Sequence, residues 1–455
     1  MNTPIADFVK TYQENKITRF HMPGHKGHVF FGCEPFDITE IKGADVLHHG
    51  NGIIAESEKN ATLLFGSGAT HYSTEGSTHC VKSMLGILMM ESKQRNQQKR
   101  PFILAARNVH RSMIDACALL DLDVSFLWEN SNSICDAVVT KEYLERTLNA
   151  CEQLPLAVYI TSPDYLGHVA DIQGLSGVCQ KYDVPLVVDN AHGAYLHFEK
   201  EPKHPMDLGA AMCCDSAHKT LPVLTGGAYL HISKAYLKRF EPYARQVLSL
   251  FGSTSPSYPV LQSLDLCNRY LSDNYQIRLQ ETQEKIAVCK EEFIKDGIIV
   301  EESESLKIVI NTAANGYTGD AIAEEMRKSQ IECEYSDWQN VVLMITPENE
   351  DRDFERLTKW KETTCLITNR QQPLAKKPVC YGKMTQKMTI REAVFSAWEW
   401  IEAKDAVGRI CAMETVSCPP AIPIAVSGEE ITTEMVQLFD AYGISKIAVV
   451  RTPPL

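Results

Sequence analysis

The sequence has no long apolar run, no Cys-x-x-Cys pair and no excess of basic residues. Because no run approaches the roughly 20 apolar residues that cross a bilayer, we expect no membrane-spanning helix and no membrane partner. The 45 basic side chains are outnumbered by 58 acidic ones, which argues against nucleic acid as a partner. The first residues contain no basic segment followed by an apolar one, so we expect no signal peptide and a cytoplasmic protein.

The 15 cysteines are scattered along the chain, without a paired framework. In a chain of this length, such cysteines are usually small core residues in a reducing compartment. The histidines near the start, His21, His25, His48 and His49, do not have metal-ligand spacing, and no cysteine or carboxylate completes a set. We therefore expect neither disulfides nor a metal site.

The length of 455 residues is typical of two or three domains, and 44% hydrophobic and 23% charged residues are ordinary globular values. We found no internal repeat and no low-complexity tract. Four ranges are predicted: an irregular N-terminal arm, a large domain, a small α/β domain and a C-terminal domain, at residues 1–60, 61–270, 271–367 and 368–455.

Short apolar segments alternate with helical patterns from about residue 60 onward, which predicts βαβ units and a mostly parallel sheet. The α/β pattern rests on buried strands such as residues 102–106 and amphipathic helices such as residues 81–89. Further strands are expected at residues 124–128, 156–161, 185–189, 228–232, 307–311 and 341–346 and around residue 212. Further helices are expected at residues 110–120, 175–182, 265–286, 320–328 and 351–361 and around Phe395, Trp398 and Trp400.

Two of the expected strands end near residues that suit a pyridine cofactor. Asp189 ends one strand, and Lys219 follows the next strand along the chain. In parallel α/β sheets ligands bind beyond the carboxyl ends of the strands. A lysine there can form a Schiff base with the aldehyde of pyridoxal phosphate (PLP), while the carboxylate keeps the ring nitrogen protonated. The plainer alternatives are a solvated lysine and an aspartate that caps a turn.

Other parts of such a site have candidates nearby. Gly76, Ser77 and Thr78 precede a helix expected to begin near His79, and a helix N-terminus with two hydroxyl groups suits a phosphate. The alternative is an ordinary N-cap. The remaining candidates are His110 and Ala191 against the two ring faces, His218 as a proton donor or neighbour of the substrate carboxylate, and Ser216 on the phosphate; structural roles remain open for all four.

Taken together, these segments resemble the fold-type-I Orn/Lys/Arg decarboxylase family in its short form, which lacks an N-terminal receiver-like domain. The residues that carry the resemblance span the chain. They are Phe20-His21-Met22-Pro23-Gly24-His25-Lys26-Gly27, Gly76-Ser77-Thr78, Arg107-Asn108-Val109-His110-Arg111-Ser112, Asp189-x-Ala191-His192-Gly193, Ser216-Ala217-His218-Lys219-Thr220-Leu221-Pro222, Ser255-Pro256-Ser257-Tyr258, Ser263-Leu264-Asp265, Arg391-Glu392-Ala393, Gly408-Arg409-Ile410 and Pro419-Pro420-x-Ile422-Pro423.

The resemblance implies the PLP-dependent transferase fold type I and decarboxylation of a basic amino acid: lysine, ornithine or arginine. It also implies cofactor contacts from Lys219, Asp189, Ala191, His192, His110, Gly76, Ser77, Thr78 and Ser216, with Lys219, His218, Asp189 and His110 in catalysis. The loop at Ser255 resembles one that reaches a neighbouring subunit's phosphate. A homodimer, or a higher homo-oligomer, with shared active sites is therefore expected.

Several positions depart from the family's pattern and leave the substrate open. Asn190 stands where the family usually has Glu, Gly226 where it has Gln, and Asp164 where it tends to have Thr. Near the C-terminus the departures are Met413, Glu414, Cys418 and Ala421. The same residue set also suits an aminotransferase, a racemase, another lyase or a silent regulatory homologue. No arginine is obviously placed for an α-carboxylate, as aminotransferases need, so decarboxylation is favoured.

Overall fold

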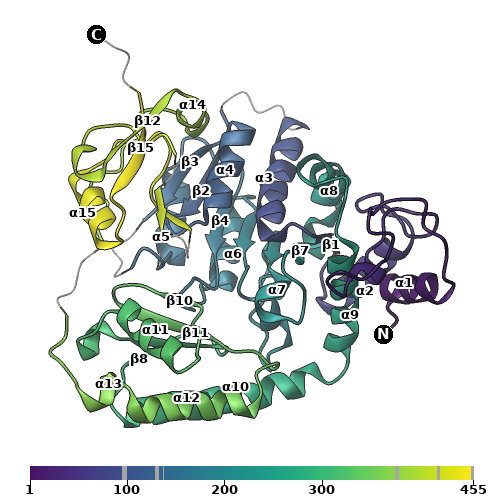
Figure 1. Cartoon of the computed structure of the whole chain (residues 1–455). Coiled ribbons are helices and arrows are strands. Elements are labelled where there is room, and N and C mark those ends of the chain that lie inside the picture. Colours follow the sequence, from purple (N-terminus) through teal and green to yellow (C-terminus); the bar gives the residue numbers. More distant parts are fainter. Residues whose placement is uncertain are drawn as a thin grey trace. The chain divides into compact units, whose positions relative to one another are not determined.

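The computed structural model describes residues 1–94, 100–128, 133–136, 138–374, 379–413, 415–417 and 421–451 (Figure 1). The chain forms two compact units. The first comprises residues 1–101, 141–160 and 171–277, and the second comprises residues 102–140, 161–170 and 278–455. These units cut across the four predicted domain ranges, which stay a prediction.

The first unit contains five strands in the order β1-β7-β6-β5-β4. They are β1 (Ala69–Ser73), β4 (Val158–Thr161), β5 (Leu186–Asp189), β6 (Met212–Asp215) and β7 (Ala228–Ile232). β5 and β6 pair in parallel, whereas β7 is antiparallel to both β6 and β1. The expectation of an α/β fold is confirmed, but the sheet is mixed: residues 216–227 contain one helical turn, where a parallel crossover would usually carry a full helix.

The helices of the first unit include two that the sequence analysis missed. The N-terminal arm is predicted to be irregular, but α1 (Pro4–Glu14) and α2 (Ile53–Leu64) are helical. The start of α1 is held by Asp265, whose carboxylate accepts from the backbone N–H groups of Ile5 (2.9 Å) and Ala6 (3.0 Å). The other helices are α3 (Gly76–Gln94), α5 (Lys141–Ala150), α6 (Ile172–Lys181), α7 (Ala217–Thr220), α8 (Leu237–Phe251) and α9 (Tyr258–Ser272).

The long helix expected at residues 265–286 is instead two helices. α9 ends at Ser272, and α10 (Tyr275–Lys295) begins three residues later. Asn274 between them has a φ of 57°, a left-handed conformation that interrupts a right-handed helix and that asparagine tolerates better than most residues.

The second unit contains the parallel pair β2 (Phe102–Ala106) and β3 (Asp123–Leu127). Helix α4 (Arg111–Leu120) connects these two strands in the chain. It also contains an antiparallel sheet of order β10-β11-β9-β8. Its strands are β8 (Val300–Glu301), β9 (Lys307–Asn311), β10 (Tyr335–Ser336) and β11 (Asn340–Met344), with helices α11 (Gly319–Lys328), α12 (Asp351–Thr363) and α13 (Cys365–Thr368).

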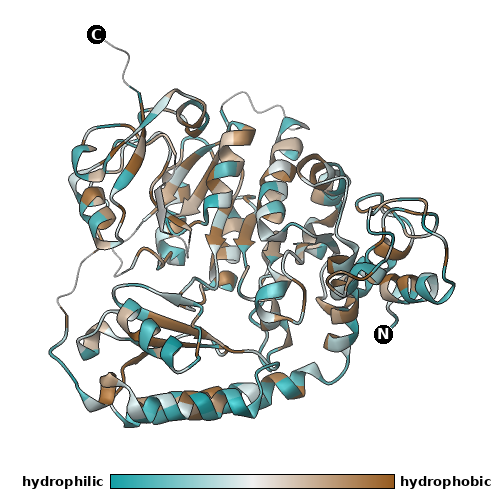
Figure 2. Ribbon diagram, in the orientation of Figure 1, coloured by the Kyte–Doolittle hydropathy of each residue, from teal (hydrophilic) through white to brown (hydrophobic). Residues whose placement is uncertain are grey.

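Helices α10 and α12 lie side by side (Figure 1). Lys361 of α12 joins them, since its Nζ lies 3.0 Å from a carboxylate oxygen of Glu292 and 2.8 Å from one of Asp296. Figure 2 shows hydrophilic residues along these two helices and hydrophobic residues along the strands of the antiparallel sheet. The antiparallel sheet of the second unit thus buries one of its faces beneath amphipathic helices.

The C-terminal part of the second unit corrects one prediction. The helix expected around Phe395, Trp398 and Trp400 is wrong, because α14 (Ile390–Val394) ends before Phe395 and both tryptophans lie in strand β12 (Trp398–Glu402). The alternation of Trp398, Glu399, Trp400 and Ile401 has the period of two that suits a strand. β12 pairs with β15 (Lys446–Val450), and β13 (Thr415–Ser417) pairs with β14 (Ile422–Ala425).

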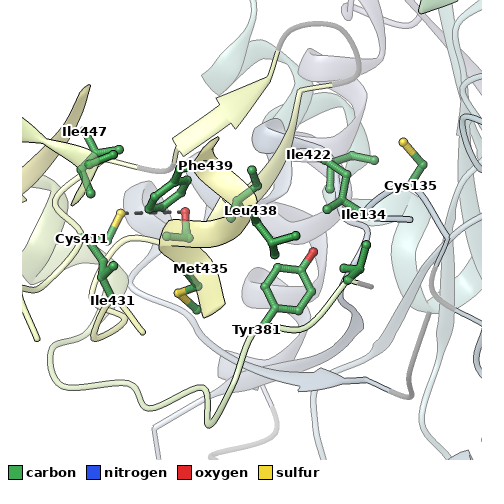
Figure 3. Packing of buried hydrophobic residues seen from close by; sticks show 14 of the residues in the cluster. Ile134, Cys135, Tyr381, Cys411, Ile422, Ile431, Met435, Leu438, Phe439 and Ile447 are labelled. Carbon is green, nitrogen blue, oxygen red and sulfur yellow. Dashed lines mark hydrogen bonds between the residues drawn. The ribbon is translucent and has the colours of Figure 1, made fainter. Parts of the chain in front are cut away.

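A hydrophobic cluster forms the core of this part (Figure 3). Met435, Leu438 and Phe439 of α15 (Thr433–Ala441) pack in it with Tyr381 and Ile134. Throughout the described ranges, no helix has both the length and the apolar character that crossing a bilayer requires.

Candidate active site

The turn that carries Lys219 follows directly from strand β6. Ser216 comes after the last residue of β6, and Lys219 lies within the single helical turn α7. The Nζ atom of Lys219 is 2.9 Å from Nε2 of His192, which is buried and lies three residues beyond the end of β5. The fold therefore brings together two of the predicted residues, Lys219 and His192.

Asp189 is the last residue of β5 and pairs in register with Cys214 of β6. It is 3% exposed. One carboxylate oxygen accepts from the backbone N–H of Ala191 at 3.2 Å and lies 3.6 Å from the Cys214 sulfur. The other oxygen accepts from the hydroxyl of Tyr159 at 3.3 Å. These contacts fix the direction of the carboxylate, and the sequence had given no sign of the part played by Tyr159.

The candidate phosphate cradle is the first turn of α3, which begins at Gly76 and not near His79 as expected. Gly76 has a φ of 72°, and no atom lies within 4 Å of the position that a Cβ would take. The hydroxyl of Ser216 donates to that of Ser77 at 2.8 Å, and Thr78 follows in the same half-buried turn. Open space beside the N–H groups of a 19-residue helix is the arrangement that binds anions.

Gly226 closes the cradle from the other side. Its carbonyl accepts from Gly76 N–H at 2.7 Å, and its φ is 99°. A Cβ at this position would lie 2.7 Å from the carbonyl oxygen of Thr74, a distance that real Cβ atoms do not adopt. The departure from the family's usual Gln thus has a local reason, because only glycine fits here.

Two residues that the sequence analysis did not select support this turn. Burial lowers the pKa of His79, whose Nδ1 is 2.8 Å from the Ser73 hydroxyl and whose Nε2 is 2.9 Å from the carbonyl of Leu248. As a neutral ring, His79 donates from Nε2 and accepts at Nδ1. Glu75 accepts from the backbone N–H of Ser253 at 2.6 Å, which joins the cradle to the loop that contains Ser255.

A second buried carboxylate, Asp215, stands next to Ser216. Nε2 of His204 lies 3.0 Å and Nε2 of His231 lies 3.1 Å from one of its oxygens. The other oxygen accepts from the side-chain amide of Asn190 at 2.6 Å. Burial raises the pKa of Asp215, but the two histidines more than offset this and hold it below the ordinary range. Asn190 therefore has a partner that explains why an amide suits the position.

The side chains of His204, Asp215 and His231 offer possible metal-ligand atoms within 4.8 Å of one another. The hydrogen-bond partners of the two histidines favour hydrogen bonds to Asp215 over metal binding. The backbone N–H of Met206 donates to Nδ1 of His204 at 3.2 Å. In the neutral ring Nε2 must then carry the proton and donate it to Asp215, so this nitrogen has no lone pair for a metal. Nδ1 of His231 lies 2.8 Å from the Thr70 hydroxyl, which leaves its Nε2 to donate in the same way.

His218 and Ser255 have less direct support. Nδ1 of His218 is 3.0 Å from the carbonyl of Gly227 and must donate to it, so the neutral ring carries its lone pair on Nε2. Ser255 is exposed, and its backbone N–H donates to the Ser253 hydroxyl at 3.1 Å. Their predicted roles, like those of Ala191 and Thr78, stay predictions.

His110 and Asp164 belong to the second unit. His110 is the N-cap of α4, and its Nδ1 accepts from Ser112 N–H at 3.1 Å. Stacking of His110 on a cofactor therefore stays a prediction. Asp164 lies 2.8 Å from Nδ1 of His168, and this hydrogen bond raises the pKa of His168 to about 9. Of the C-terminal departures, Glu414 and Cys418 lie outside the described residues.

The fold is similar to that of solved fold-type-I PLP-dependent enzymes. The lysine decarboxylase LdcF of Francisella novicida has a TM-score of 0.79 at 16% identity, covering 99% of this chain and 81% of that one. The constitutive lysine decarboxylase of Escherichia coli has a TM-score of 0.77 at 17% identity, with 99% and 82% covered. The fold is therefore fold type I, the fold of this class of PLP-dependent enzymes.

Sequence comparison defines the family. A family model described as Orn/Lys/Arg decarboxylase, major domain, matches residues 3–316, and the C-terminal domain of the same family matches residues 369–445. The chain belongs to the Orn/Lys/Arg decarboxylase family. An arginine decarboxylase of Bacillus subtilis is 27% identical over 471 residues, covering 95% of this chain and 92% of that protein. An arginine decarboxylase of Halalkalibacterium halodurans is 27% identical, with 94% and 91% covered.

Proposed function

We propose that this chain is a PLP-dependent decarboxylase of a basic amino acid: lysine, ornithine or arginine. Family membership and relatives that are named arginine decarboxylases support the reaction class. The observation that carries the proposal is the contact of 2.9 Å between Lys219 and His192, beside the buried Asp189. An amine and a carboxylate at adjacent strand ends are the two groups that a PLP ring requires.

The residues present fit that cofactor. The open side of Gly76 and the paired hydroxyls of Ser77 and Ser216 suit its phosphate. Lys219 would hold the aldehyde carbon covalently, and Asp189 would pair with the pyridine nitrogen. When bound, PLP would serve as the sink for the electron pair left at Cα as carbon dioxide departs.

The chain's own groups would bind, orient and move protons. Nε2 of His192 can accept a hydrogen bond from the Lys219 ammonium. This contact would hold the lysine side chain where the PLP aldehyde is proposed to lie. His218, with its proton held on Nδ1 by the Gly227 carbonyl, keeps Nε2 as a site where a proton can be taken up and returned. The buried Tyr159 hydroxyl and Ala191 N–H keep Asp189 from turning away.

The proposal includes a homodimer or larger homo-oligomer in the cytoplasm. The exposed Ser255 loop, joined to the cradle through Glu75, supports a role in reaching a second subunit. The described cysteines are all free thiols, which suits a reducing compartment.

The Lys219→Ala variant tests the proposal against the matched variant Lys181→Ala, which removes an exposed lysine of the same unit. Purified protein with PLP is assayed for carbon dioxide release from L-lysine, L-ornithine and L-arginine, with keto-acid formation followed in parallel. Lys219→Ala should lose the visible absorption band and at least about a hundredfold in turnover, whereas Lys181→Ala should match the wild type.

Keto acid without carbon dioxide would contradict decarboxylation and indicate an aminotransferase. A visible band without turnover of any amino acid would favour a silent homologue, and a band that persists in Lys219→Ala would overturn the assignment of the lysine.

A further inference from the structure

Arg107 is a fully buried guanidinium that follows the last residue of β2 in the second unit. Its Nη1 donates to the carbonyl of Pro423 at 3.1 Å, and its Nη2 donates to the carbonyl of Ile424 at 2.9 Å. Nη2 also pairs with a carboxylate oxygen of Glu429 at 3.2 Å, where both side chains are buried. Three acceptors from residues 421–429 thus hold one arginine.

Two aromatic rings fix the guanidinium by its faces. Its Cζ lies 4.7 Å from the ring centroid of Phe126 in β3 and 4.7 Å from that of Tyr381. Tyr381 is itself packed in the C-terminal hydrophobic cluster, beside Ile134 and Leu438 (Figure 3). Because the planar fork is bonded at its edge and covered by rings, Arg107 has one orientation.

The segment of residues 421–429 also contacts the backbone of Arg111, four residues after Arg107. The carbonyl of Ala421 accepts from the backbone N–H of Arg111 at 2.9 Å. Glu429 is anchored in turn, since the carboxylate oxygen that pairs with Arg107 also accepts from Val426 N–H at 2.8 Å. Residues 107–111 are therefore fastened at both ends, and His110 lies between the two anchors.

We propose that residues 421–429 are a positioning element for His110, acting through Arg107 and Arg111. This inference rests on the proposed function and on the prediction that His110 stacks on the PLP ring. The ring of His110 is oriented locally by Ser112, so what the C-terminal segment sets is the place of the loop and not the tilt of the imidazole. Residues 421–429 would thereby contribute to cofactor binding through residues 107–111.

The test compares Glu429→Gln with Glu304→Gln. The second variant breaks another buried ion pair of the same unit, Glu304 with Lys307 of β9 at 2.9 Å. The first readout is hydrogen exchange of the amides of residues 108–112 in protein without cofactor. The second readout is the dissociation constant of PLP and the visible circular dichroism of the bound form.

Both variants should unfold at lower temperature than the wild type. Glu429→Gln should in addition exchange the amides of residues 108–112 about tenfold faster, and should weaken PLP binding and change the visible dichroism. Glu304→Gln should change neither. Should Glu429→Gln fail to fold, Arg107→Lys keeps the charge but cannot reach all three acceptors, and the same changes are expected.

The inference is overturned if Glu429→Gln only lowers the unfolding temperature, with amide exchange, PLP affinity and dichroism as in Glu304→Gln. The proposed function fails in a different way: wild-type protein would then not bind PLP at Lys219, while the exchange measurement would still report whether the segment holds the loop.

Discussion

Two aspartate–histidine groups in this chain share the same chemistry and differ in burial. In the first unit Asp215 contacts His204 and His231 at 3.0 and 3.1 Å, and in the second unit Asp164 contacts His168 at 2.8 Å. The histidine pKa values move in opposite directions. Burial lowers the pKa of His231, whereas the hydrogen bond from Asp164 raises that of His168 to about 9.

The difference follows from exposure and from the number of donors. The side chains of His204, His231 and Asp215 are 0% exposed, while that of His168 is 42% exposed. Where water is excluded, burial disfavours the charged form of His231, and the Asp215 carboxylate accepts from several donors that include Asn190. Where water reaches the ring, as at His168, pairing with the Asp164 carboxylate favours the charged imidazolium. The hydrogen bonds to Asp215 can therefore hold the turn before Lys219 in one geometry.

The largest effect that would sharpen this comparison is expected from Asp215→Asn. An amide cannot accept from all three donors, so at least one buried N–H would face another donor, at a cost of about 3 kcal/mol in the free energy of unfolding. Asp207→Asn is the matched control, because Asp207 pairs with His197 at 2.8 Å in the same unit with both side chains partly exposed. Urea unfolding should show a cost below about 1 kcal/mol for the control. Equal costs would contradict the account.

The pH dependence of stability should differ in sign. The pKa of Asp215 is held below its ordinary 3.8, so its contribution is present above about pH 4 and is lost as the pH falls further. The pKa of His168 rises from 6.5 to about 9, so its contribution is present below pH 6.5 and is lost as the pH rises through about 9. Thermal unfolding of Asp215→Asn and His168→Gln across the pH range checks both. Parallel trends in the two variants would refute the contrast.

The smallest effect is the response to salt. Raising sodium chloride from 0.1 to 1 M shortens the screening length from about 10 to about 3 Å. The cost of His168→Gln, below about 1 kcal/mol because the ring is exposed, should shrink by about half. The cost of Asp215→Asn should stay constant, because ions do not enter that core. A salt-sensitive Asp215→Asn would show that water reaches the network.

Much of the first unit could be predicted because its site is built from neighbours along the chain. Strands β5 and β7 lie where their apolar runs place them, and Asp189 and Lys219 were selected from strand-end chemistry. The antiparallel direction of β7 could not be predicted, since it depends on the tight return at Gly226. Helix α1 was not predicted although Ile5, Val9 and Tyr12 recur at helical spacing, and the contact of its first turn with Asp265, 260 residues from Ile5, has no local signal.

The supporting residues were harder to find, and distance along the sequence is the reason. The bonds of Arg107 to Pro423 and Glu429 span 316 and 322 residues, and no local pattern signals such a contact. His204 and His231 are isolated in the sequence and become a pair only when the segment before β6 and strand β7 both reach Asp215. The prediction of a helix at Trp398 and Trp400 is wrong because their spacing of two residues is typical of a strand.

The most direct test of the central claim is borohydride reduction of the PLP-loaded protein followed by peptide mass spectrometry. The account predicts a pyridoxyl phosphate adduct on the peptide that contains Lys219 and on no other lysine. An adduct on a different lysine, or none after reconstitution with PLP, would contradict it.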